Sequence, residues 1–534
     1  MILIRDLKLR PDEPQERLRE LAAKKLRVPA GAILDWKLVK RSLDARKKND
    51  ITYVCAVAVS LRGEENAAVA RAKSPAVTVY EEADYPIPRV ATPALRPVVV
   101  GFGPAGMFAA LLLAMAGARP IVLERGQDAL TRRAAVERFR TGGGLDTENN
   151  VQFGEGGAGT FSDGKLNTGT HDRRLRWVLR QFAAHGAPES VTYDAKPHIG
   201  TDILVDVVQN LRRTVCEMGG EVRFGSRMER LILRDGALCG VEVVCGGERY
   251  ALSCEKLILA IGHSARDTFE TLHAQGVPMQ PKPFAMGVRI EHRQADIDLA
   301  QYGRARGELP AADYSLHIHL PGGKSAYTFC MCPGGEVFAA ASETGGVVTN
   351  GMSYSRRDGE NANAALLVGL QPEDFPYPGV LGGMRWQREI EQACYRYGGG
   401  DYRAPAQRVG DFLIGKPSDG SGGVQPSYRP GVHWGDLHEV LPPRITDVLE
   451  QAIPELGKKL RGFDAPDAVL TAPETRSSSP VRILRGESLS ADIAGLYPCG
   501  EGAGYAGGIS SAAVDGLRCA EAVLRSLDGS VATC

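Results

Sequence analysis

Apolar side chains fill residues 98–125 almost without interruption, and the pattern within this stretch changes from strand to helix and back to strand. A short apolar run leads into Gly101, Gly103 and Gly106, an apolar run of helix length follows, and a second strand-like run ends at Glu124. A buried parallel strand and the helix that covers it produce such continuous apolar sequence. The pattern therefore predicts a β-α-β unit.

The three glycines of this unit have the spacing of a dinucleotide-binding turn. Gly101 permits the tight turn after the strand, Gly103 lets the backbone approach a pyrophosphate, and Gly106 lets helix and strand pack closely. Glu124, 23 positions after Gly101, can accept hydrogen bonds from ribose hydroxyls and would repel a 2′-phosphate. These residues predict an adenine dinucleotide that lacks this phosphate.

The residues before this unit have a different pattern, with shorter apolar alternations and two amphipathic stretches. The predicted elements are strands at 2–9, 31–41, 51–61 and 75–80 and helices at 14–27 and 64–72. This order is that of a ferredoxin-like βαββαβ domain. The proline-rich residues 83–95 lack periodicity and are predicted to form a linker.

A basic cluster lies between the two central strands of that domain and consists of Arg41, Arg46, Lys47 and Lys48. A solvated loop and a nucleic-acid contact both account for such a cluster. The solvated loop is favoured, because most charge runs are solvated faces.

A glycine-rich segment, 142–169, follows the β-α-β unit where a simple nicotinamide dehydrogenase would continue through further strand-helix repeats. It contains a second formal Gly-x-Gly-x-x-Gly, but no strong strand pattern precedes it, so we interpret it as a loop and not as a second dinucleotide-binding turn. Its glycines and polar side chains can lay backbone N–H groups against a flat polar heterocycle. A flexible surface loop is the alternative.

Regular structure resumes at Thr201, the predicted N-cap of a helix, and continues through a strand and a hairpin. In large flavoproteins this order carries the strand that faces the adenine, and by that analogy the backbone of Met228 would contact the adenine. A strand at 256–262 then returns to the sheet. Gly262 marks a close backbone approach, and His263 is interpreted as structural rather than catalytic.

The closing segment, 491–534, combines a strand that ends at Glu501 with a helix that starts near Gly508. The acid suits the ribityl and pyrophosphate region, while the helix N-terminus directs its partial positive charge toward the flavin N1/O2 edge. Motifs at both ends of the chain together favour FAD over NAD. The predicted FAD-binding residues are Gly101, Gly103, Pro104, Ala105, Gly106, Glu124, Arg125, Gly157, Gly159, Thr160, Ser162, Asp163, Lys165, Met228, Gly262, Glu501, Gly508 and Ile509.

Eight segments carry a resemblance to a known family: VVVGFGPAGMFAA, FGEGGAGTFSDGKL, AIGHSARDTFE, KPFAMGVRIEH, YTFCMCPGGEVFAAASE, TNGMSYSRRDGENANAAL, ETRSSSPVRI and CGEGAGYAGGISSAAVDGL. With them, essentially the whole chain resembles the bacterial FAD-dependent dehydrogenases, described as NAD(FAD)-utilising dehydrogenase-like, near the aminoacetone-oxidase-like flavoproteins. The resemblance implies a glutathione-reductase-type FAD-binding Rossmann fold with an inserted domain. It implies no particular substrate.

The predicted fold class is therefore α/β. A ferredoxin-like domain at 1–82 and a linker at 83–95 precede an FAD-binding domain in two parts, 96–275 and 491–534. Between these parts lies an inserted mixed α+β cap or substrate domain at 276–490. This inserted domain is expected to select the substrate.

The inserted domain contains a predicted hairpin about two glycines at 322–323. Strand alternation places two histidines and two cysteines on one face of this hairpin, namely His317, His319, Cys330 and Cys332. Such a set can bind zinc. Pairing about the turn, however, sets Cys330 opposite Ser315 and Cys332 opposite Asp313, so the four side chains are not expected to converge. No metal site is predicted.

Redox exchange with the flavin is a second hypothesis for Cys330 and Cys332. On an extended strand their thiols point the same way about 7 Å apart, at or beyond the Cα separation that a disulfide tolerates. Cysteines also pack readily as small hydrophobic side chains. The sequence favours the packing role, and replacing both cysteines with serine is expected to leave flavin reduction intact.

Two polar segments are candidates for substrate contact. The first contains Arg476, Ser477, Ser478 and Arg482. A guanidinium with hydroxyls suits a carboxylate or phosphate, and a solvated arginine loop is at least equally consistent. The second contains Asn350, Ser353, Arg356, Asn361 and Asn363, which serve either helix capping or substrate contact. The weak catalytic candidates are Arg476, Ser478 and His198.

Composition agrees with an enzyme of two or three domains, since the chain has 534 residues, 64 basic and 64 acidic side chains. The eleven cysteines form no secreted disulfide framework. Residues 97–118 carry no charge, but Pro104 and four glycines interrupt them, so no membrane span is expected. The N-terminus shows no export signal, and a cytoplasmic protein is expected.

Two functions are consistent with these observations. The first is an FAD-dependent oxidoreductase that transfers a hydride between a small organic substrate, anionic if the arginine segment contacts it, and flavin N5. The second is a flavin-bound RNA-associated or tRNA-modifying protein whose N-terminal domain recruits nucleic acid. Balanced charge and the lack of aromatic RNA-binding motifs favour the first.

The electron source is predicted from an absence in the sequence. No second strand-glycine-helix unit follows the first, so there is no dedicated NAD(P)H domain. Electrons are expected to come from an organic substrate or from a partner reductase, with the N-terminal domain as a docking module.

Overall fold

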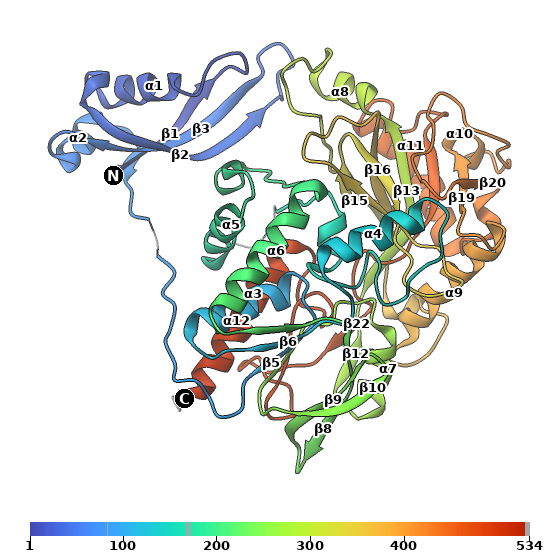
Figure 1. Cartoon of the computed structure of the whole chain (residues 1–534). Helices are drawn as coiled ribbons and strands as arrows, with labels where there is room; N and C mark the ends of the chain where they lie inside the picture. The colour runs from blue at the N-terminus through green and yellow to red at the C-terminus, as the bar shows by residue number, and fades with distance from the viewer. Residues whose placement is uncertain (83, 167–168, 170–171, 529–534) are drawn as a thin grey trace.

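A computed structural model describes residues 1–82, 84–166, 169 and 172–528 of the chain. The first residue of the predicted linker, two residues of the glycine-rich segment (167–168) and the last six residues of the closing segment lie outside this part. A small N-terminal sheet lies at one edge of the molecule, and an extended chain connects it to the first strand of a parallel sheet at the opposite end (Figure 1).

The N-terminal region has the predicted element order β-α-β-β-α-β. Its strands are β1 (Ile2–Leu9), β2 (Ile33–Asp44), β3 (Thr52–Leu61) and β4 (Val77–Val79), and its helices are α1 (Arg17–Leu26) and α2 (Glu65–Ala72). The antiparallel sheet has the strand order β2-β3-β1-β4. Leu18 of α1 and Ala68 of α2 are buried against the strands, so one face of the sheet carries the core of this region.

The predicted β-α-β unit lies in a parallel five-stranded sheet. The strand order is β23 (Leu496–Pro498), β11 (Leu257–Leu259), β5 (Val98–Val100), β6 (Ile121–Leu123) and β7 (Glu221–Arg223). Between β5 and β6 runs α3 (Pro104–Ala116), which is apolar on all sides because other helices cover it. The last helix, α12 (Ile509–Leu527), lies beside α3 (Figure 1). The chain thus returns to this parallel sheet in its closing segment, as predicted.

Further elements extend this half of the molecule. The additional helices are α4 (Ala129–Arg140), α5 (Arg174–Ala184), α6 (Thr201–Glu217) and α7 (Arg266–Ala274). An antiparallel sheet contains β8 (Ser226–Arg234), β9 (Ala237–Cys245) and β10 (Glu248–Ser253). The predicted helix, strand and hairpin are therefore present, but the predicted N-cap is wrong, because Gly200 is the N-cap of α6 and the Thr201 hydroxyl donates instead to the carbonyl of Thr160.

The glycine-rich segment between α4 and α5 forms a loop, as predicted. No strand precedes its second glycine motif, and its only regular element among the described residues is the short 3-10 helix η2 (Gly157–Phe161). Arg132 of α4, whose side chain is fully buried, holds the loop by donating hydrogen bonds to the carbonyls of Asn150 (2.7 Å), Val151 (2.6 Å) and Glu155 (2.7 Å). Burial lowers the pKa of the Arg132 guanidinium to about 9.

The inserted region is built on a seven-stranded sheet. Its strand order is β14 (His317–His319), β15 (Ser325–Cys332), β18 (Asn361–Leu370), β13 (Phe284–Arg293), β21 (Val469–Glu474), β19 (Ala404–Arg408) and β20 (Val432–Trp434). Its helices are α8 (Gln294–Tyr302), α9 (Gly382–Tyr397), α10 (Val409–Phe412) and α11 (Pro443–Lys459). The remaining strands form two antiparallel pairs, β16 (Gly335–Ala339) with β17 (Thr349–Ser353), and β12 (Met279–Pro281) with β22 (Val481–Ile483). The second pair lies where the chain enters and leaves the inserted region.

The predicted pairings of Cys330 with Ser315 and of Cys332 with Asp313 are wrong. β14 spans only three residues, with His317 opposite Tyr327, and its pairing ends before it reaches the cysteines. Cys332 instead lies opposite Asn363 of β18. The two histidines are exposed while Cys332 is buried, so the predicted common face does not form either.

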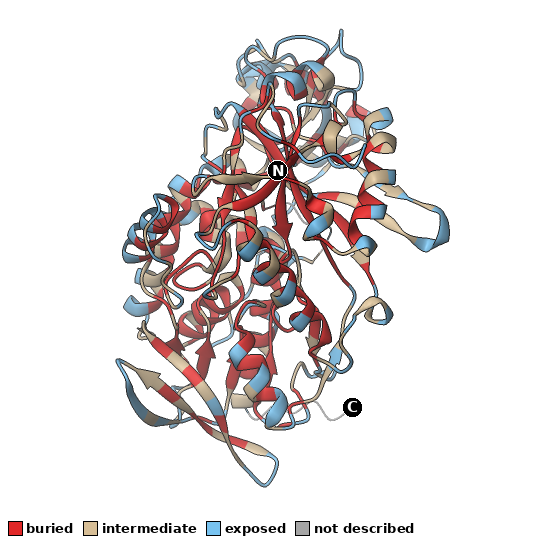
Figure 2. Cartoon of the chain, turned by 90° about the vertical axis from the view of Figure 1, so that its right-hand side faces the viewer, coloured by how far each residue is buried: buried red, intermediate tan, exposed pale blue. Residues whose placement is uncertain are grey.

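The two sheets are joined by a buried ion cluster. Arg266 at the start of α7 is 1% exposed and donates to Glu391 of α9 at 2.8 Å and to Glu343 at 2.6 Å. Figure 2 shows that buried residues continue from one sheet into the other, while exposed residues lie on the outer helices and loops. The elements that surround the space between the two sheets are thus held in fixed positions.

Candidate functional site

A cavity of about 770 Å³ opens at the carboxyl ends of the parallel strands. Residues that directly follow β5, β6 and β11 line it: 101–105, 124–125 and 260–265. Open α/β sheets bind ligands at this edge. Residues of β15 and β21 line the same cavity, which therefore lies between the parallel sheet and the inserted sheet.

Two helices, α3 and α12, begin at this cavity. Gly103 is the N-cap of α3 and Gly508 is the N-cap of α12, and neither helix has a side-chain cap. The first residues of both helices line the cavity. Uncapped N–H groups and the helix dipole attract anionic oxygen atoms. These two positions fit a pyrophosphate at α3 and the N1/O2 edge of a flavin at α12.

Glycines adapt this cavity in two different ways. A Cβ atom on Gly106 would lie 1.9 Å from the carbonyl oxygen of Gly101, so glycine is needed there for helix-strand packing. A Cβ atom on Gly262, Gly507 or Gly508 would meet no protein atom within 4 Å, and all three residues line the cavity. The second group leaves space that a ligand can fill close to the backbone.

Glu124 projects its carboxylate to the cavity from the end of β6. Its Oε2 accepts the N–H of Phe102 at 2.8 Å, and its Oε1 accepts those of Gly126 and Gly154, each at 2.9 Å. These bonds fix the carboxylate between the glycine turn and the glycine-rich loop. The remaining lone pairs can accept ribose hydroxyls, which agrees with the predicted role.

Most predicted cofactor residues are brought together by the fold. Those that line the cavity are Gly101, Gly103, Pro104, Ala105, Glu124, Arg125, Gly157, Gly159, Ser162, Lys165, Met228, Gly262, Glu501, Gly508 and Ile509. The Arg125 guanidinium also pairs with Glu148 at 2.8 Å and with Asp267 at 2.9 Å, and it stacks on Phe153. It therefore braces the wall of the cavity.

Three predicted cofactor residues do not line the cavity. Gly106 lies under the turn, where it permits packing. Thr160 is buried in η2, and its hydroxyl donates to the carbonyl of Glu155 at 3.2 Å. Asp163 is fully buried and pairs with Lys165 at 2.7 Å and with Arg357 at 2.9 Å, which together hold its pKa well below the usual range. For Thr160 and Asp163 the prediction of direct contact is corrected to support of the loop.

The inserted sheet supplies the other half of the cavity lining. The polar and sulfur-containing residues on this side are Tyr314, Thr328, Cys330, Met331, Asn350, Glu474, Arg476 and Ser477. Sequence analysis did not select Tyr314 or Glu474. The sequence position of Glu474 could have marked it as a candidate. It ends the apolar run 469–473, and a carboxylate on a buried strand has to be either paired or functional.

Two carboxyl groups, the buried Glu474 and the partly buried Glu501, face the cavity with raised pKa values. Burial raises the pKa of Glu474 to about 7, although Arg289 lies 3.0 Å away. Burial also raises the pKa of Glu501 to about 7, against a hydrogen bond from the N–H of Gly508. A carboxyl group in this range can either accept or donate a proton near neutral pH.

His263 also lines the cavity, and its side chain is 12% exposed. Burial lowers the pKa of the imidazole to about 3, with Arg476 and Arg266 adding to the effect, so the ring is neutral. Its Nε2 lies 3.8 Å from Glu501, and its Nδ1 has no hydrogen-bond partner among the described residues. An unpaired buried polar atom at a cavity wall fits a bound polar group.

The weak catalytic candidates have other partners. Arg476 lines the cavity, but its guanidinium pairs with Glu391 at 2.8 Å and also donates to Ser342, so its charge is already neutralised. Ser478 and His198 do not line the cavity. His198 instead lies 3.1 Å from the carbonyl oxygen of Ser355. Of the second polar segment, Asn350 alone lines the cavity.

The basic cluster of the N-terminal region is largely engaged within the chain. Arg41 pairs with Asp194 at 2.7 Å, and Arg46 pairs with Asp44 at 2.6 Å. Lys48 donates to the carbonyl of Ala300 at 2.7 Å. The Arg41 and Lys48 contacts join the N-terminal region to the rest of the molecule, and none of these contacts supports a nucleic-acid interface.

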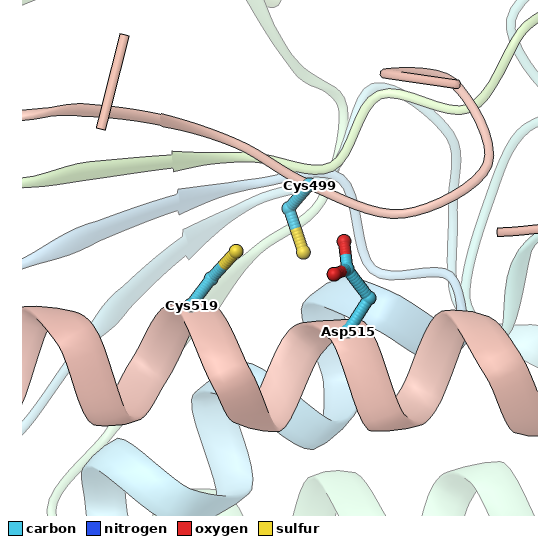
Figure 3. A group of neighbouring side chains, drawn as sticks. All are labelled: Cys499, Asp515 and Cys519. Atoms are coloured by element: carbon cyan, nitrogen blue, oxygen red, sulfur yellow. The ribbon is translucent and has the colours of Figure 1, made fainter. Parts of the chain in front are cut away.

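Cys499, which lines the cavity, gathers with Asp515 and Cys519 in a metal-like arrangement (Figure 3). Arg485 already pairs with the Asp515 carboxylate at 2.6 Å, and the N–H of Gly500 donates to it at 2.8 Å. Burial raises the pKa of the Cys499 thiol well above its usual range, which opposes metal binding through a thiolate. The cluster instead anchors α12 to the end of β23.

A protein of Clostridium beijerinckii, described as an uncharacterized protein, is 46% identical over 533 residues and matches 99% of each chain. The chain belongs to the same family as this protein. Residues 283–477 match the family model described as FAD-dependent protein, C-terminal domain-like, and residues 1–60 match a domain of unknown function, DUF8436.

Solved structures with a similar arrangement include several flavoproteins. The flavin-dependent brominase Bmp2 is 13% identical, with 82% of this chain and 80% of that chain covered and a TM-score of 0.37. A geranylgeranyl bacteriochlorophyll reductase-like protein of Thermoplasma acidophilum is 12% identical, with 81% and 79% covered and a TM-score of 0.36. A flavoprotein/dehydrogenase of Cytophaga hutchinsonii is 11% identical, with 82% and 79% covered and a TM-score of 0.36. At these scores the likeness adds no argument about the site.

The cofactor is FAD. The family model names FAD-dependent proteins, and the cavity offers the two helix N-termini, the open glycines and the Glu124 carboxylate that an FAD molecule requires. The chain is accordingly an FAD-dependent protein. Among the described helices, none is both long and apolar enough to cross a membrane.

Proposed function

We propose that the protein transfers a hydride between a small organic substrate and N5 of its FAD, with the substrate bound on the side of the cavity that the inserted sheet lines. A single observation carries this proposal. One cavity of about 770 Å³ joins the nucleotide-binding edge of the parallel sheet to a wall with a titratable carboxyl group and polar side chains. Bound FAD supplies the acceptor or donor of the hydride.

The residues of the inserted sheet have distinct roles in this proposal. Glu474 accepts a proton from the substrate as the hydride leaves, because its pKa of about 7 suits general base catalysis near neutral pH. Arg289, fully buried and 3.0 Å from Glu474, orients that carboxylate. Tyr314 and Asn350 face the same space and position the substrate. The two apposed sheets exclude water from this space, which strengthens these polar contacts.

The charge balance of the cavity bears on the substrate class. Arg476 pairs with Glu391 and Lys165 pairs with Asp163, so neither cation is available as a free anion receptor. An uncharged substrate or one with a single acidic group is therefore favoured over a strongly anionic one.

The experiment is an anaerobic reduction of the purified yellow protein by a panel of α-hydroxy acids, amino acids and primary amines. Loss of the long-wavelength absorbance of the flavin with one class, and its return with oxygen, is the expected result. A flavin that no member of the panel reduces, and that passes its electrons only to oxygen after photoreduction, would contradict the proposal. Release of FMN in place of FAD on denaturation would contradict it as well.

A further inference from the structure

The segment Cys330-Met331-Cys332 at the end of β15 does not form a regular strand. Phe329 lies opposite Ala365 and Cys332 lies opposite Asn363, so β15 has one more residue than β18 in this interval. Cys330 has a φ of +41°, in the left-handed region. Such a bulge ends the strict alternation of side chains. The separation of about 7 Å between alternate thiols of a regular strand therefore does not apply here.

The bulge brings the two thiol groups together. The Sγ of Cys332 donates to the carbonyl oxygen of Cys330 at 3.2 Å, which places this thiol against its neighbour. The interaction between the two thiols, with Lys165 and Arg289 nearby, lowers the pKa of the Cys330 thiol to about 6. The same interaction and burial raise the pKa of the Cys332 thiol well above its usual value. Cys330 is thus the thiolate and Cys332 the thiol of the pair at neutral pH.

Charged side chains from three elements hold this segment. Lys165 of the glycine-rich loop donates to the carbonyl of Met331, between the two cysteines. Arg289 of β13 donates to the carbonyl of Cys330 at 3.0 Å and pairs with Glu474 of β21 at 3.0 Å. The Asp163 carboxylate, which pairs with Lys165, also acts on the Cys330 thiol. Two cations thus oppose two carboxyl groups around one thiolate.

The two sulfur atoms differ in access. Cys330 lines the cavity, together with the glycine-rich loop and the start of α12, where the flavin fits. Cys332 is fully buried behind it and does not line the cavity. An accessible thiolate with a second thiol behind it is the arrangement of a nucleophilic and a resolving cysteine. A non-glycine residue held at positive φ beside a cavity is a further mark of a functional position.

We propose that Cys330 and Cys332 form a dithiol/disulfide pair that exchanges two electrons with the bound FAD. The proposal rests on the proposed function, because it places a second redox group on the substrate side of the same cavity. In the oxidising direction the Cys332 thiol loses its proton, Cys330 reacts as the thiolate, and a bond forms between the two Sγ atoms. The two electrons and that one proton pass to FAD. Reduced flavin reverses the same step.

The competing role is that of two packed small hydrophobic side chains. It accounts for the burial of Cys332, but it accounts neither for the bulge that places the Cys332 Sγ against Cys330 nor for the two cations that hold this segment. A redox pair requires both features, because a stabilised thiolate has to lie next to its partner sulfur.

The first test is an anaerobic titration of the yellow protein with dithionite, starting from the fully oxidised state. The native protein is expected to take up about four electrons per FAD, two for the flavin and two for the disulfide. Cys330→Ser and Cys332→Ser are expected to take up about two. The matched control is the double variant Cys239→Ser/Cys245→Ser, which changes two half-exposed cysteines of β9 outside the cavity and keeps the uptake of four.

The second test is a readout on the protein alone. Oxidised protein is digested after alkylation, and mass spectrometry determines whether the peptide with Cys330 and Cys332 lacks two hydrogens and resists the alkylating reagent. After reduction, Cys330 is expected to react with iodoacetamide faster than the exposed Cys216, whose thiol has a raised pKa. Two free thiols at 330 and 332 in the oxidised protein would overturn the proposal.

The outcomes separate this proposal from the proposed function. A yellow protein that takes up only two electrons per FAD, yet is reduced by an organic donor, refutes the redox pair and keeps the oxidoreductase. A protein that takes up four electrons but is reduced by no donor in the panel keeps the pair and refutes the proposed hydride donor. A protein without flavin would refute both.

Discussion

Glu124 shows how one side chain can serve both the fold and the ligand. Its two oxygens bind three backbone N–H groups that belong to the glycine turn, to the end of β6 and to the glycine-rich loop. The carboxylate is therefore in place before any nucleotide arrives. A preorganised acceptor costs little entropy on binding, so its hydrogen bonds to ribose contribute fully to affinity.

Glu124→Ala is expected to weaken FAD binding by about 1.5–3 kcal/mol, the value of charge-assisted hydrogen bonds, which corresponds to roughly ten- to a hundredfold in Kd. The measurement is fluorescence titration of the apoprotein with FAD. Glu242→Ala on β9 removes a carboxylate outside the cavity and is expected to leave the affinity unchanged. An equal loss of affinity in both variants would show that the effect is not local.

Glu474 leads to a prediction about pH. Its pKa in the folded protein is raised from 4.5 to about 7 by burial, so below that pH the group is protonated and cannot accept a proton. The rate of flavin reduction by an organic donor is expected to rise through an ionisation near pH 7. Glu474→Gln should abolish this ionisation and slow reduction by about 10²–10⁴-fold.

Glu501 supplies the matched control for that pH profile. It has the same raised pKa but lies beside the N-cap of α12 rather than on the inserted sheet. Glu501→Gln is expected to keep the pH dependence of the rate and to change FAD affinity instead. If Glu501→Gln removed this pH dependence and Glu474→Gln kept it, the two roles would have to be exchanged.

The same two pKa values bear on stability. A raised carboxyl pKa means that the folded state binds the proton more tightly than the unfolded state. Each group therefore lowers the free energy of unfolding as the pH rises from 4.5 to about 7.

At the scale of elements, the glycines near α3 and α12 have different roles. One lets its helix pack on the strand, and the other leaves room for the ligand. Gly106 of α3 touches the turn below it, whereas Gly507, just before α12, faces open space in the cavity. A methyl group therefore has opposite consequences at the two positions.

Gly106→Ala is expected to destabilise the apoprotein, because its Cβ would lie 1.9 Å from the carbonyl oxygen of Gly101. Gly507→Ala is expected to keep the Tm of the apoprotein and to lower FAD affinity several-fold, because its Cβ meets no protein atom within 4 Å and occupies ligand space. Differential scanning fluorimetry without and with FAD distinguishes the two effects. Unchanged FAD affinity in Gly507→Ala would place the flavin elsewhere in the cavity.

Elements with local signals could be predicted from the sequence. The β-α-β unit could be predicted from the run 98–125, because strand, turn and helix there are close in sequence and mostly apolar. The irregular β15 could not be predicted, since its bulge is set by pairing with β18, some thirty residues away. Thr160 and Asp163 had the same polar character as their neighbours Ser162 and Lys165. Only the fold of η2 and the ion pair with Arg357 turn them away from the cavity.

The strand pairing of the inserted sheet could not be predicted from the sequence for the same reason. Its central strand β13 pairs with β18 and with β21, whose residues follow β13 by about 80 and 185 positions. The Arg289–Glu474 pair spans that second interval. No periodicity in a single sequence indicates which distant strands pair, so the substrate side of the cavity could not be assembled from motifs.

At the scale of the whole molecule, the site depends on the contact between two sheets. The β12–β22 pair and the buried cluster of Arg266, Glu391 and Arg476 connect them. Removing one partner of such a buried cluster leaves an unpaired charge and costs about 3–5 kcal/mol. The cavity between the sheets therefore has a defined width, which suits a flavin enzyme that excludes water from hydride transfer.

The electron source follows from the same architecture. Within the described residues, one strand-glycine turn-helix unit serves the dinucleotide, and the inserted region is built on a mainly antiparallel sheet. NADH and NADPH are therefore expected to reduce the flavin slowly. The faster reductant is expected to be an organic donor, or a partner reductase that would dock on the N-terminal region. The measurement is anaerobic rapid mixing with each nicotinamide, followed at the flavin absorbance. Bleaching within seconds by micromolar NADH or NADPH would show that the inserted sheet binds nicotinamide. In that case Tyr314 and Asn350 would have to contact the nicotinamide ring, and the physiological substrate would be the acceptor of the hydride rather than its donor.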